Sequence, residues 1–279
     1  MSLQSQRILY DNTSTEADLS VSLNDFRTAS ETIAADTGHY IYIASELPFN
    51  HRYILVDTAN DQAATLTVHI WFGKEWIAAV DILDQTASGG KTLAQSGILS
   101  WKTNRLKGWD REQDSEDVTG VDAVGIYNAH WVRIGFSAAL KNTTSLTWLG
   151  HRFATDDVLY SYYPDLNNST LQGAFESGKT DWNEQHYMAG EQIVRDLKAR
   201  GIAWSANQIL DWKIFEEAGA HRAAAIIYAG MDSAYRDNKK DAEAAYAKAM
   251  NIKRLNLDQN ASGNLERSER GQVTGWMRR

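Results

Sequence analysis

The chain of 279 residues carries a formal net charge of −8, is 43% hydrophobic and contains no cysteine. This length suits one large domain or two ordinary ones, and the lack of cysteine excludes disulfides, thiolate zinc sites and a cysteine nucleophile. The first residues do not resemble a secretory signal, and no apolar run reaches the roughly 20 residues that cross a bilayer. We therefore expect synthesis in a cytoplasm and no contact with a membrane.

The charge is unevenly distributed along the chain. Residues 1–165 hold 12 Lys and Arg against 21 Asp and Glu, whereas residues 166–279 hold 16 against 15. Because phosphate backbones are bound by basic surfaces, the acidic first part argues against nucleic acid as its ligand. The same charge would keep a large assembly in solution or repel DNA that passes close to it.

The first part of the chain predicts strands. Short segments rich in β-branched and aromatic residues follow one another from Gly38, and many alternate in polarity. Residues 19–23 also fit a strand, and Gly73-Lys74 has the composition of a hairpin turn. Since no helical pattern intervenes, we predict a β-sandwich, most closely a jelly roll, over residues 1–165. The main predicted strands are 39–43, 52–56, 65–72, 75–80, 97–101, 131–136 and 145–149.

The second part, residues 166–256, predicts a bundle of helices, so the fold class is α+β. Residues 182–200 are apolar on one side, and Gly201 is placed to end that helix. Residues 223–228 supply a helix rich in alanine. A third helix opens near Asp237, with its apolar residues on one face and its charges on the other.

Between these helices lies a helix-start signal. Ser205 and Gln208 form a capping box, and Trp204 and Ile209 stand where a hydrophobic staple would bracket it. The residues that follow predict a helix that is apolar over most of its circumference. Gly219 would allow this helix either to break or to pack tightly against a neighbour.

Residues 257–279 hold charges, glycines and one Trp but no periodic apolar pattern, so we predict an extended C-terminal arm. Such a segment either frays or becomes ordered on a partner. We favour the partner, with the Trp as a buried anchor and the arginines paired with carboxylates. The residues assigned to this contact are Arg267, Arg270, Trp276, Arg278 and Arg279.

The segment from Gln208 to Tyr228, the charged Ala-rich helix after it and the Arg-bearing C-terminus resemble the head-to-tail connector (adaptor) proteins of tailed bacteriophages. The resemblance spans roughly residues 184–279 and is one of pattern. It implies a homo-oligomeric ring in the neck of a virion, with twelve subunits to match the portal, assembled from chains made in the host cytoplasm. DNA would pass through the lumen without being read.

The same resemblance implies contacts for each part of the chain. The arm would dock on the portal protein, and the sandwich would contact tail, nozzle or fibre proteins. Simple adaptors consist of the helical part alone, so the large N-terminal sandwich departs from the pattern of the family.

No motif requires catalysis, a cofactor or a metal. The acidic stretch 110–117 alternates carboxylates as a calcium loop does, but Ser115 and Val121 stand where that loop needs Gly and Glu, so we interpret it as a solvated loop. Residues 89–92 resemble the end of a phosphate-binding loop without its first Gly or its helix, and we interpret them as a turn. The histidines lack metalloprotease spacing, and no Gly-x-Ser-x-Gly elbow occurs. We therefore expect a protein that is not an enzyme.

Tryptophans support a second hypothesis. Trp71, Trp131 and Trp148 lie inside apolar runs and predict core positions, whereas Trp101 and Trp109 border polar loops and could stack on sugar rings. The order of residues from Ser100 to Phe136 is also similar to lectin-like or discoidin-like sandwich modules. The alternative function is therefore a carbohydrate-binding or fibre-anchoring virion module. An enzyme acting on glycans is a third possibility, because a carboxylate pair would be set by the fold.

Overall fold

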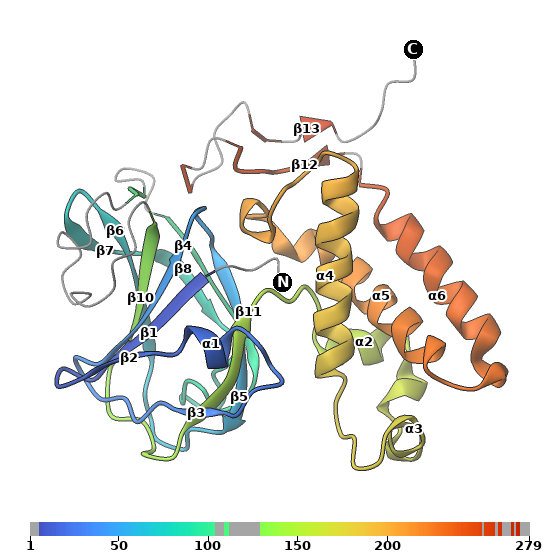
Figure 1. The fold of residues 1–279 in the computed structure, drawn as a ribbon, viewed down its shortest axis with the longest axis horizontal. Coiled ribbons are helices and arrows are strands. Elements are labelled where there is room, and N and C mark those ends of the chain that lie inside the picture. The colour runs from blue at the N-terminus through green and yellow to red at the C-terminus, as the bar shows by residue number, and fades with distance from the viewer. Residues whose placement is uncertain are drawn as a thin grey trace. The chain divides into compact units, whose positions relative to one another are not determined.

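A computed structural model describes residues 6–103, 109–111, 129–252, 254–259, 262–263, 269–270 and 272–273. The chain divides into two compact units (Figure 1). The sandwich unit comprises Met1–Gly150 with Asp258–Arg267, and the helical unit comprises His151–Leu257 with Ser268–Arg279. The division after Gly150 precedes the predicted boundary at residue 165, because Leu159 packs in the same core as Trp182 of the helical unit.

Within the described residues, the strands of the sandwich unit form two sheets in which every pair is antiparallel. The six-stranded sheet has the order β2 (Glu16–Asp18), β1 (Gln6–Asp11), β4 (Tyr40–Ser45), β10 (His130–Phe136), β6 (Leu66–Phe72) and β7 (Glu75–Ala78). The five-stranded sheet has the order β3 (Glu31–Thr32), β11 (Ser145–Gly150), β5 (His51–Thr58), β9 (Gly97–Lys102) and β8 (Val80–Asp84).

Both sheets contribute to one apolar core. It contains Ile41 and Val132 from the six-stranded sheet and Ile54 and Leu149 from the five-stranded sheet. Neighbouring side chains in a strand point to opposite faces. Ile8 therefore lies in this core, whereas Leu9 belongs to a second cluster with residues such as Tyr42, Trp71 and Trp131. The predicted core positions of Trp71, Trp131 and Trp148 are confirmed, since all three are buried.

The hairpin prediction is also confirmed. Phe72 pairs with Glu75, and both residues between them, Gly73 and Lys74, have positive φ, as a two-residue type I′ turn requires.

The strand expected at residues 19–23 is wrong. Ser20–Leu23 form the single-turn helix α1, in which Leu19 and Leu23 are buried and Val21 between them is exposed. Positions i and i+4 share a face of a helix whereas position i+2 lies opposite, and the buried hydroxyl of Ser20 pins the turn by accepting from the amide of Ile8. Five residues in which apolar and polar side chains alternate fit the period of a strand and also that of a single helical turn.

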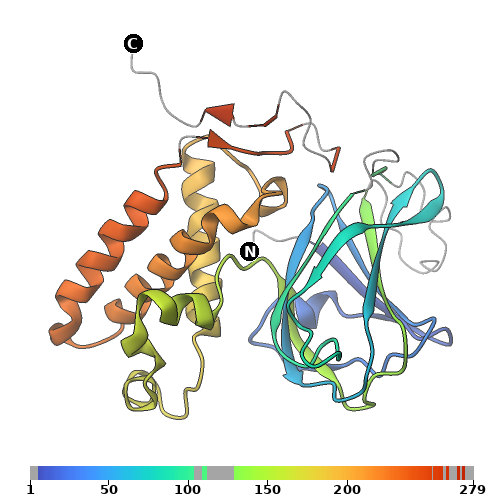
Figure 2. The ribbon, with the colours of Figure 1, turned by 180° about the vertical axis from the view of Figure 1, so that it is seen from behind.

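The helical unit contains α2 (Asp156–Tyr162), α3 (Ser169–Phe175), α4 (Asn183–Ala199), α5 (Glu216–Ala229) and α6 (Arg236–Ala249). Helix α5 contacts both α4 and α6 (Figure 2). Its small side chains, Ala223, Ala224 and Ala225, lie in a core with Trp182 and Tyr228. Short 3-10 turns cover Pro164–Asn167, Ala206–Gln208, Trp212–Phe215 and Ser233–Tyr235, and β12 (Arg254–Leu255) pairs with β13 (Gln272–Val273).

The structure tests the predictions made for two glycines of the helical unit. Gly201 ends α4 as predicted: its φ is +66°, its amide bonds to the carbonyl of Lys198, and the amide of Ile202 bonds to that of Leu197, which is the Schellman arrangement. Of the two alternatives at Gly219, the break does not occur, because α5 continues through this residue, and tight packing is confirmed. A Cβ there would lie 3.0 Å from that of Ala154, so this glycine serves close packing.

The capping box at Ser205 forms, but it begins a 3-10 turn, since α5 starts only at Glu216. The predicted staple is absent in the described structure: Ile209 is buried whereas the side chain of Trp204 is 66% exposed.

The prediction of an arm without contacts to its own chain is wrong for the residues that are described. Thr103 Oγ1 donates to the carbonyl of Gly263 at 3.0 Å, and β13 pairs with β12. Asp258, Gly263 and Glu269 belong to compact units rather than to a free tail.

Glycine substitutions test this packing. A Cβ on Gly97 would lie 2.5 Å from the carbonyl oxygen of Gln85, whereas one on Gly173 in α3 would meet nothing within 4 Å. We expect Gly97→Ala to lower the free energy of unfolding by about 1–3 kcal/mol. We expect the control Gly173→Ala to leave it unchanged or raise it by up to about 1 kcal/mol. Urea unfolding followed by circular dichroism measures both; equal effects would contradict the packing of β8 against β9.

Candidate functional site: a buried carboxylate, histidine and arginine cluster

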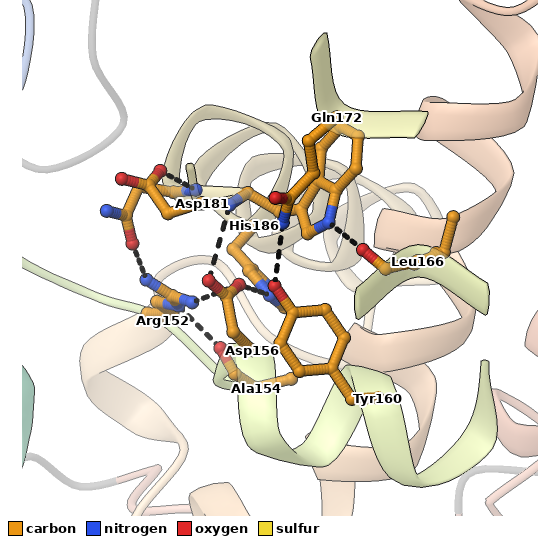
Figure 3. Close-up of polar contacts among 10 residues, drawn as sticks. Arg152, Ala154, Asp156, Tyr160, Leu166, Gln172, Asp181 and His186 are labelled. Carbon is orange, nitrogen blue, oxygen red and sulfur yellow. Dashed lines mark hydrogen bonds and ion pairs between the residues drawn. The ribbon is translucent and has the colours of Figure 1, made fainter. Parts of the chain in front are cut away.

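The densest buried polar cluster of the helical unit surrounds Asp156, the first residue of α2 (Figure 3). One oxygen of this carboxylate, Oδ1, lies 2.9 Å from Nε2 of His186 and 3.5 Å from Nη2 of Arg152. The other oxygen accepts the backbone amide of Trp182 at 3.3 Å. The cluster therefore joins the start of α2 to the start of α4.

Arg152 extends the cluster on one side. Its Nε donates to the carbonyl of Ala154, and its Nη1 donates to Oδ1 of Asn183 (Figure 3). The indole of Trp182 continues it on the other side by donating to the carbonyl of Leu166 at 3.0 Å. The chain before α2, the turn after α2 and the first turn of α4 are thus held by one connected set of hydrogen bonds.

Burial decides the protonation states. It lowers the pKa of His186 to about 4, and the charge of Arg152 acts in the same direction. His186 is therefore neutral at pH 7, and its contact with Asp156 is an N–H···O hydrogen bond. Burial alone would raise the pKa of Asp156, but the hydrogen bond from His186 and the charge of Arg152 outweigh it and hold that pKa below its usual value.

This arrangement is closed rather than open to a substrate. The side chains of His186 and Arg152 are buried, and Nδ1 of His186 has no hydrogen-bond partner among the described residues. A catalytic Asp–His pair needs a nucleophile or a substrate proton within hydrogen-bond reach of the imidazole. We therefore assign this cluster to holding the helices together.

Tyrosine hydroxyls fix the remaining helices in the same way. Tyr163 bonds to Nδ1 of His221 on α5 at 2.8 Å, and Tyr246 of α6 donates to Asp196 of α4. Burial raises the pKa of Tyr163 to about 12, so its hydroxyl stays protonated at neutral pH.

The residues predicted to contact a portal are mostly not described. Arg267, Trp276, Arg278 and Arg279 lie outside the described residues, and Arg270 is exposed. The predicted site residues are therefore not brought together by anything that the structure describes.

The two tryptophans predicted to contact glycan lie in the core of the sandwich unit, where Trp101 is 1% and Trp109 5% exposed. Each ring packs against Phe49, with centroids 5.6 and 5.3 Å away. Stacking on a sugar requires an accessible ring face, so this burial gives no support to the glycan hypothesis.

Of the acidic stretch 110–117, the structure describes Asp110 and Arg111. Asp110 Oδ2 accepts the amide of Gly73 at 3.0 Å, and Arg111 donates to the carbonyl of Glu46; residues 112–117 lie outside the described residues. Residues 89–92 form the predicted turn, with positive φ at both glycines and hydrogen bonds in both directions between Ser88 and Lys91.

Sequence reasoning missed the Asp156 cluster. Asp156 and Asp157 open a helix, where acidic residues favour the N-terminus. The 30 positions between Asp156 and His186 follow no local spacing, so the tertiary fold alone creates this pair.

The cluster makes stability depend on pH. The pKa of His186 falls from 6.5 to about 4 on folding, so the unfolded chain binds a proton between these pH values that the folded chain does not. The contribution of neutral His186 to the free energy of unfolding is fully present above pH 6.5 and is lost towards pH 4, at no more than about 1.4 kcal/mol per pH unit. His186→Gln keeps a donor for Asp156 and removes the titration. In urea unfolding, the free energy of unfolding of this variant should vary less with pH between 6.5 and 4 than that of the unmodified chain. An unchanged dependence on pH would contradict the assignment of this titration to His186.

Comparisons with known proteins do not identify a family for this chain. Searches against protein-family models, curated proteins and solved structures found no match. No helix in the described part of the chain is both long and apolar enough to cross a membrane. The resemblance to phage connectors therefore stays a prediction from sequence pattern, and the function is argued from the geometry of the units.

Proposed function

We propose that this protein is a structural component of a tailed-phage virion, a head-to-tail adaptor without catalytic activity. Its helical unit would form a homo-oligomeric ring in the neck, twelve-fold if it matches the portal, and DNA would pass through the lumen. The sandwich unit would face neighbouring tail, nozzle or fibre proteins.

The observation that carries this proposal is the exposure of Trp204. Trp is usually among the more buried residue types, yet this side chain is 66% exposed beside a capped turn whose backbone is fixed. Large exposed aromatic residues are enriched at the centres of protein interfaces. The described helical unit also exposes Tyr162, Met188 and Ile214.

The rigidity of the helical unit supports the same role. A ring subunit must present the same surface to each neighbour, and the closed clusters around Asp156 and Tyr246 fix α2, α4 and α6. The outer face of α6 carries charged pairs such as Lys239 with Glu243, which suits a solvated surface.

The order of the strands supports a jelly roll as the type of sandwich. From β2 to β6 consecutive strands alternate between the sheets, and β7 to β8, β9 to β10 and β10 to β11 cross between them again. Such crossing between two sheets is typical of Greek-key sandwiches, of which the jelly roll is one.

The arm requires a revised version of the adaptor hypothesis. Its described residues up to Val273 take part in the compact units, so they would have to detach before they could reach a portal. We therefore limit the proposed portal contact to residues 274–279, which include Trp276, Arg278 and Arg279.

The ring is tested by charge substitution at the exposed indole. Trp204→Asp places a carboxylate where the proposal puts a subunit interface, and burying an unpaired charge is costly. We expect this variant to stay folded but to fail to form rings in negative-stain images and in light scattering. The control is Val21→Asp, at a side chain that is 84% exposed on the sandwich unit, which should assemble as the unmodified chain does. Rings formed equally by both variants would contradict the interface.

The arm is tested by deleting residues 274–279, which leaves β13 in place. The shortened chain should keep the melting temperature of the full chain and lose co-sedimentation with the portal protein of the virus that encodes it. Because each arm binds weakly and a closed ring engages many at once, the loss should be largest for the assembled ring. Undiminished co-sedimentation would show that the portal contact lies elsewhere.

A further inference from the structure

One face of the six-stranded sheet carries polar and aromatic side chains that the proposed function does not use. Ile41, Val68 and Ile134 of this sheet belong to the core of the sandwich unit. Because side chains alternate along a strand, the residues beside them point to the face away from that core. We call this the aromatic face; the residues of it that matter here are Tyr40 and Tyr42 of β4, Thr67 and His69 of β6, Trp76 of β7 and Arg133 of β10.

The register of the strands places Arg133 at the centre of the aromatic face. It stands opposite Tyr42 on one side and opposite His69 on the other. Its Cζ lies 4.4 Å from the ring centroid of Tyr40 and 4.9 Å from that of Trp76. A guanidinium that is held by two rings has few orientations left, so it loses little further entropy when it binds a ligand.

The charge of Arg133 is not balanced by a carboxylate. Among the residues that the structure describes, no Asp or Glu side chain forms an ion pair with it, and its buried Nε has no hydrogen-bond partner. Burial raises the pKa of Tyr42 to about 12, so this neighbouring hydroxyl stays protonated at neutral pH and supplies no negative charge. The two rings offset part of the desolvation of the cation, and an anion would offset more of it.

His69 adds unused hydrogen-bonding capacity beside this cation. In the described structure neither of its ring nitrogens has a partner, and Nδ1 is buried. Burial, together with the charge of Arg133, lowers the pKa of His69, so the imidazole is neutral at pH 7 and can donate one hydrogen bond and accept another. The side chains of His69, Arg133 and Tyr40 are half-buried and Thr67 is exposed, so the aromatic face is in contact with solvent.

The position of these residues within the sheet decides between classes of ligand. Extended peptides bind a sheet by adding a strand at its edge, but β4, β10 and β6 are each paired on both sides. A polyanion such as a nucleic acid would be repelled, because residues 1–165 hold 12 Lys and Arg against 21 Asp and Glu. A sugar ring covers a small area, packs against aromatic side chains and exchanges hydrogen bonds through its hydroxyls.

We propose that the aromatic face binds a sugar residue that carries one carboxylate. The two terminal nitrogens of Arg133 would pair with the carboxylate. His69 would bond a hydroxyl of the sugar, and Tyr40 would contact its ring. This site is separate from the one predicted at Trp101 and Trp109, which are buried in the core.

The test is ligand-observed NMR of the full chain with methyl glycosides that differ in charge. Methyl glucuronide and methyl glucoside differ only at C6, which is a carboxylate in the first and a hydroxymethyl group in the second. Methyl galacturonide and methyl galactoside form a second pair, and a methyl sialoside is a third acidic sugar. We expect a carboxylated glycoside to bind with a dissociation constant on the order of 1 mM, as suits a ligand of this size. A neutral partner should bind at least about tenfold more weakly, since it lacks the charge-assisted pair.

Substitutions test which residues bind the acidic sugar. Arg133→Gln removes the charge and should weaken binding at least about tenfold, and Arg133→Lys should recover only part of it, because lysine makes no bidentate contact. Thr67→Glu places a carboxylate diagonally across from Arg133, within reach of a long side chain, and should block the site from an exposed position. The matched control is Arg7→Gln. Arg7 lies on the same sheet but already pairs with Asp18 at 2.8 Å, so this variant should bind as the unmodified chain does.

The proposal is overturned if none of the carboxylated glycosides binds up to about 20 mM, well beyond the expected constant, or if the neutral partners bind equally well. It is also overturned if Thr67→Glu or a folded Arg133→Gln binds normally, or if Arg7→Gln loses binding. Tighter binding of hexaglutamate than of any sugar would replace the sugar by an acidic peptide. Thermal melting shows whether each variant is folded. None of these results depends on ring formation, so the sugar site and the adaptor function are tested separately.

Discussion

The conformation of the chain after the last helix depends on two hydrogen bonds, which Asp258 accepts from the amides of Ser262 and Gly263. They fold the chain into a turn whose Gly263 carbonyl is bonded by Thr103 of the sandwich unit. After the helices end, the chain therefore rejoins the unit in which it began, and residues 268–279 then belong to the helical unit. The described residues of the tail thus belong to compact units rather than to a free arm.

This constraint changes the physical account of an adaptor. In the simplest version of the adaptor hypothesis, an unstructured arm loses conformational entropy when it becomes ordered on the portal. Here the described residues up to Val273 already contact their own chain, so assembly would depend on surfaces that exist before the partner arrives. Trp204 is such a surface residue, and the polar clusters around Asp156 and Tyr246 hold the helices of the same unit together. Pre-ordered surfaces lose less entropy on binding than arms do.

The sequence was sufficient for elements whose period is strong and whose ends are marked. The strands from β4 to β11 overlap the predicted ones except for β8, since the single strand predicted over residues 75–80 covers β7 and stops where β8 begins. Gly201 and the Gly73-Lys74 turn follow from backbone conformations that glycine permits. Short elements were ambiguous: β1 was not predicted, because its central residues Ile8 and Leu9 are buried on opposite faces and show no alternation.

Sites that depend on tertiary contacts could not be predicted from the sequence. No local spacing joins Asp156 to His186, and the burial of Trp101 and Trp109 depends on Phe49 from another segment.

The central claim is that the described residues from Asp258 to Gly263 belong to the sandwich unit and not to a free arm. Amide hydrogen exchange of the isolated full chain tests it most directly at Ser262 and Gly263. Hydrogen-bonded amides exchange only when the structure opens, so the account predicts slow exchange at both positions and faster exchange at both in Asp258→Ala. Exchange at the rate of an unfolded peptide in the unmodified chain would contradict the account.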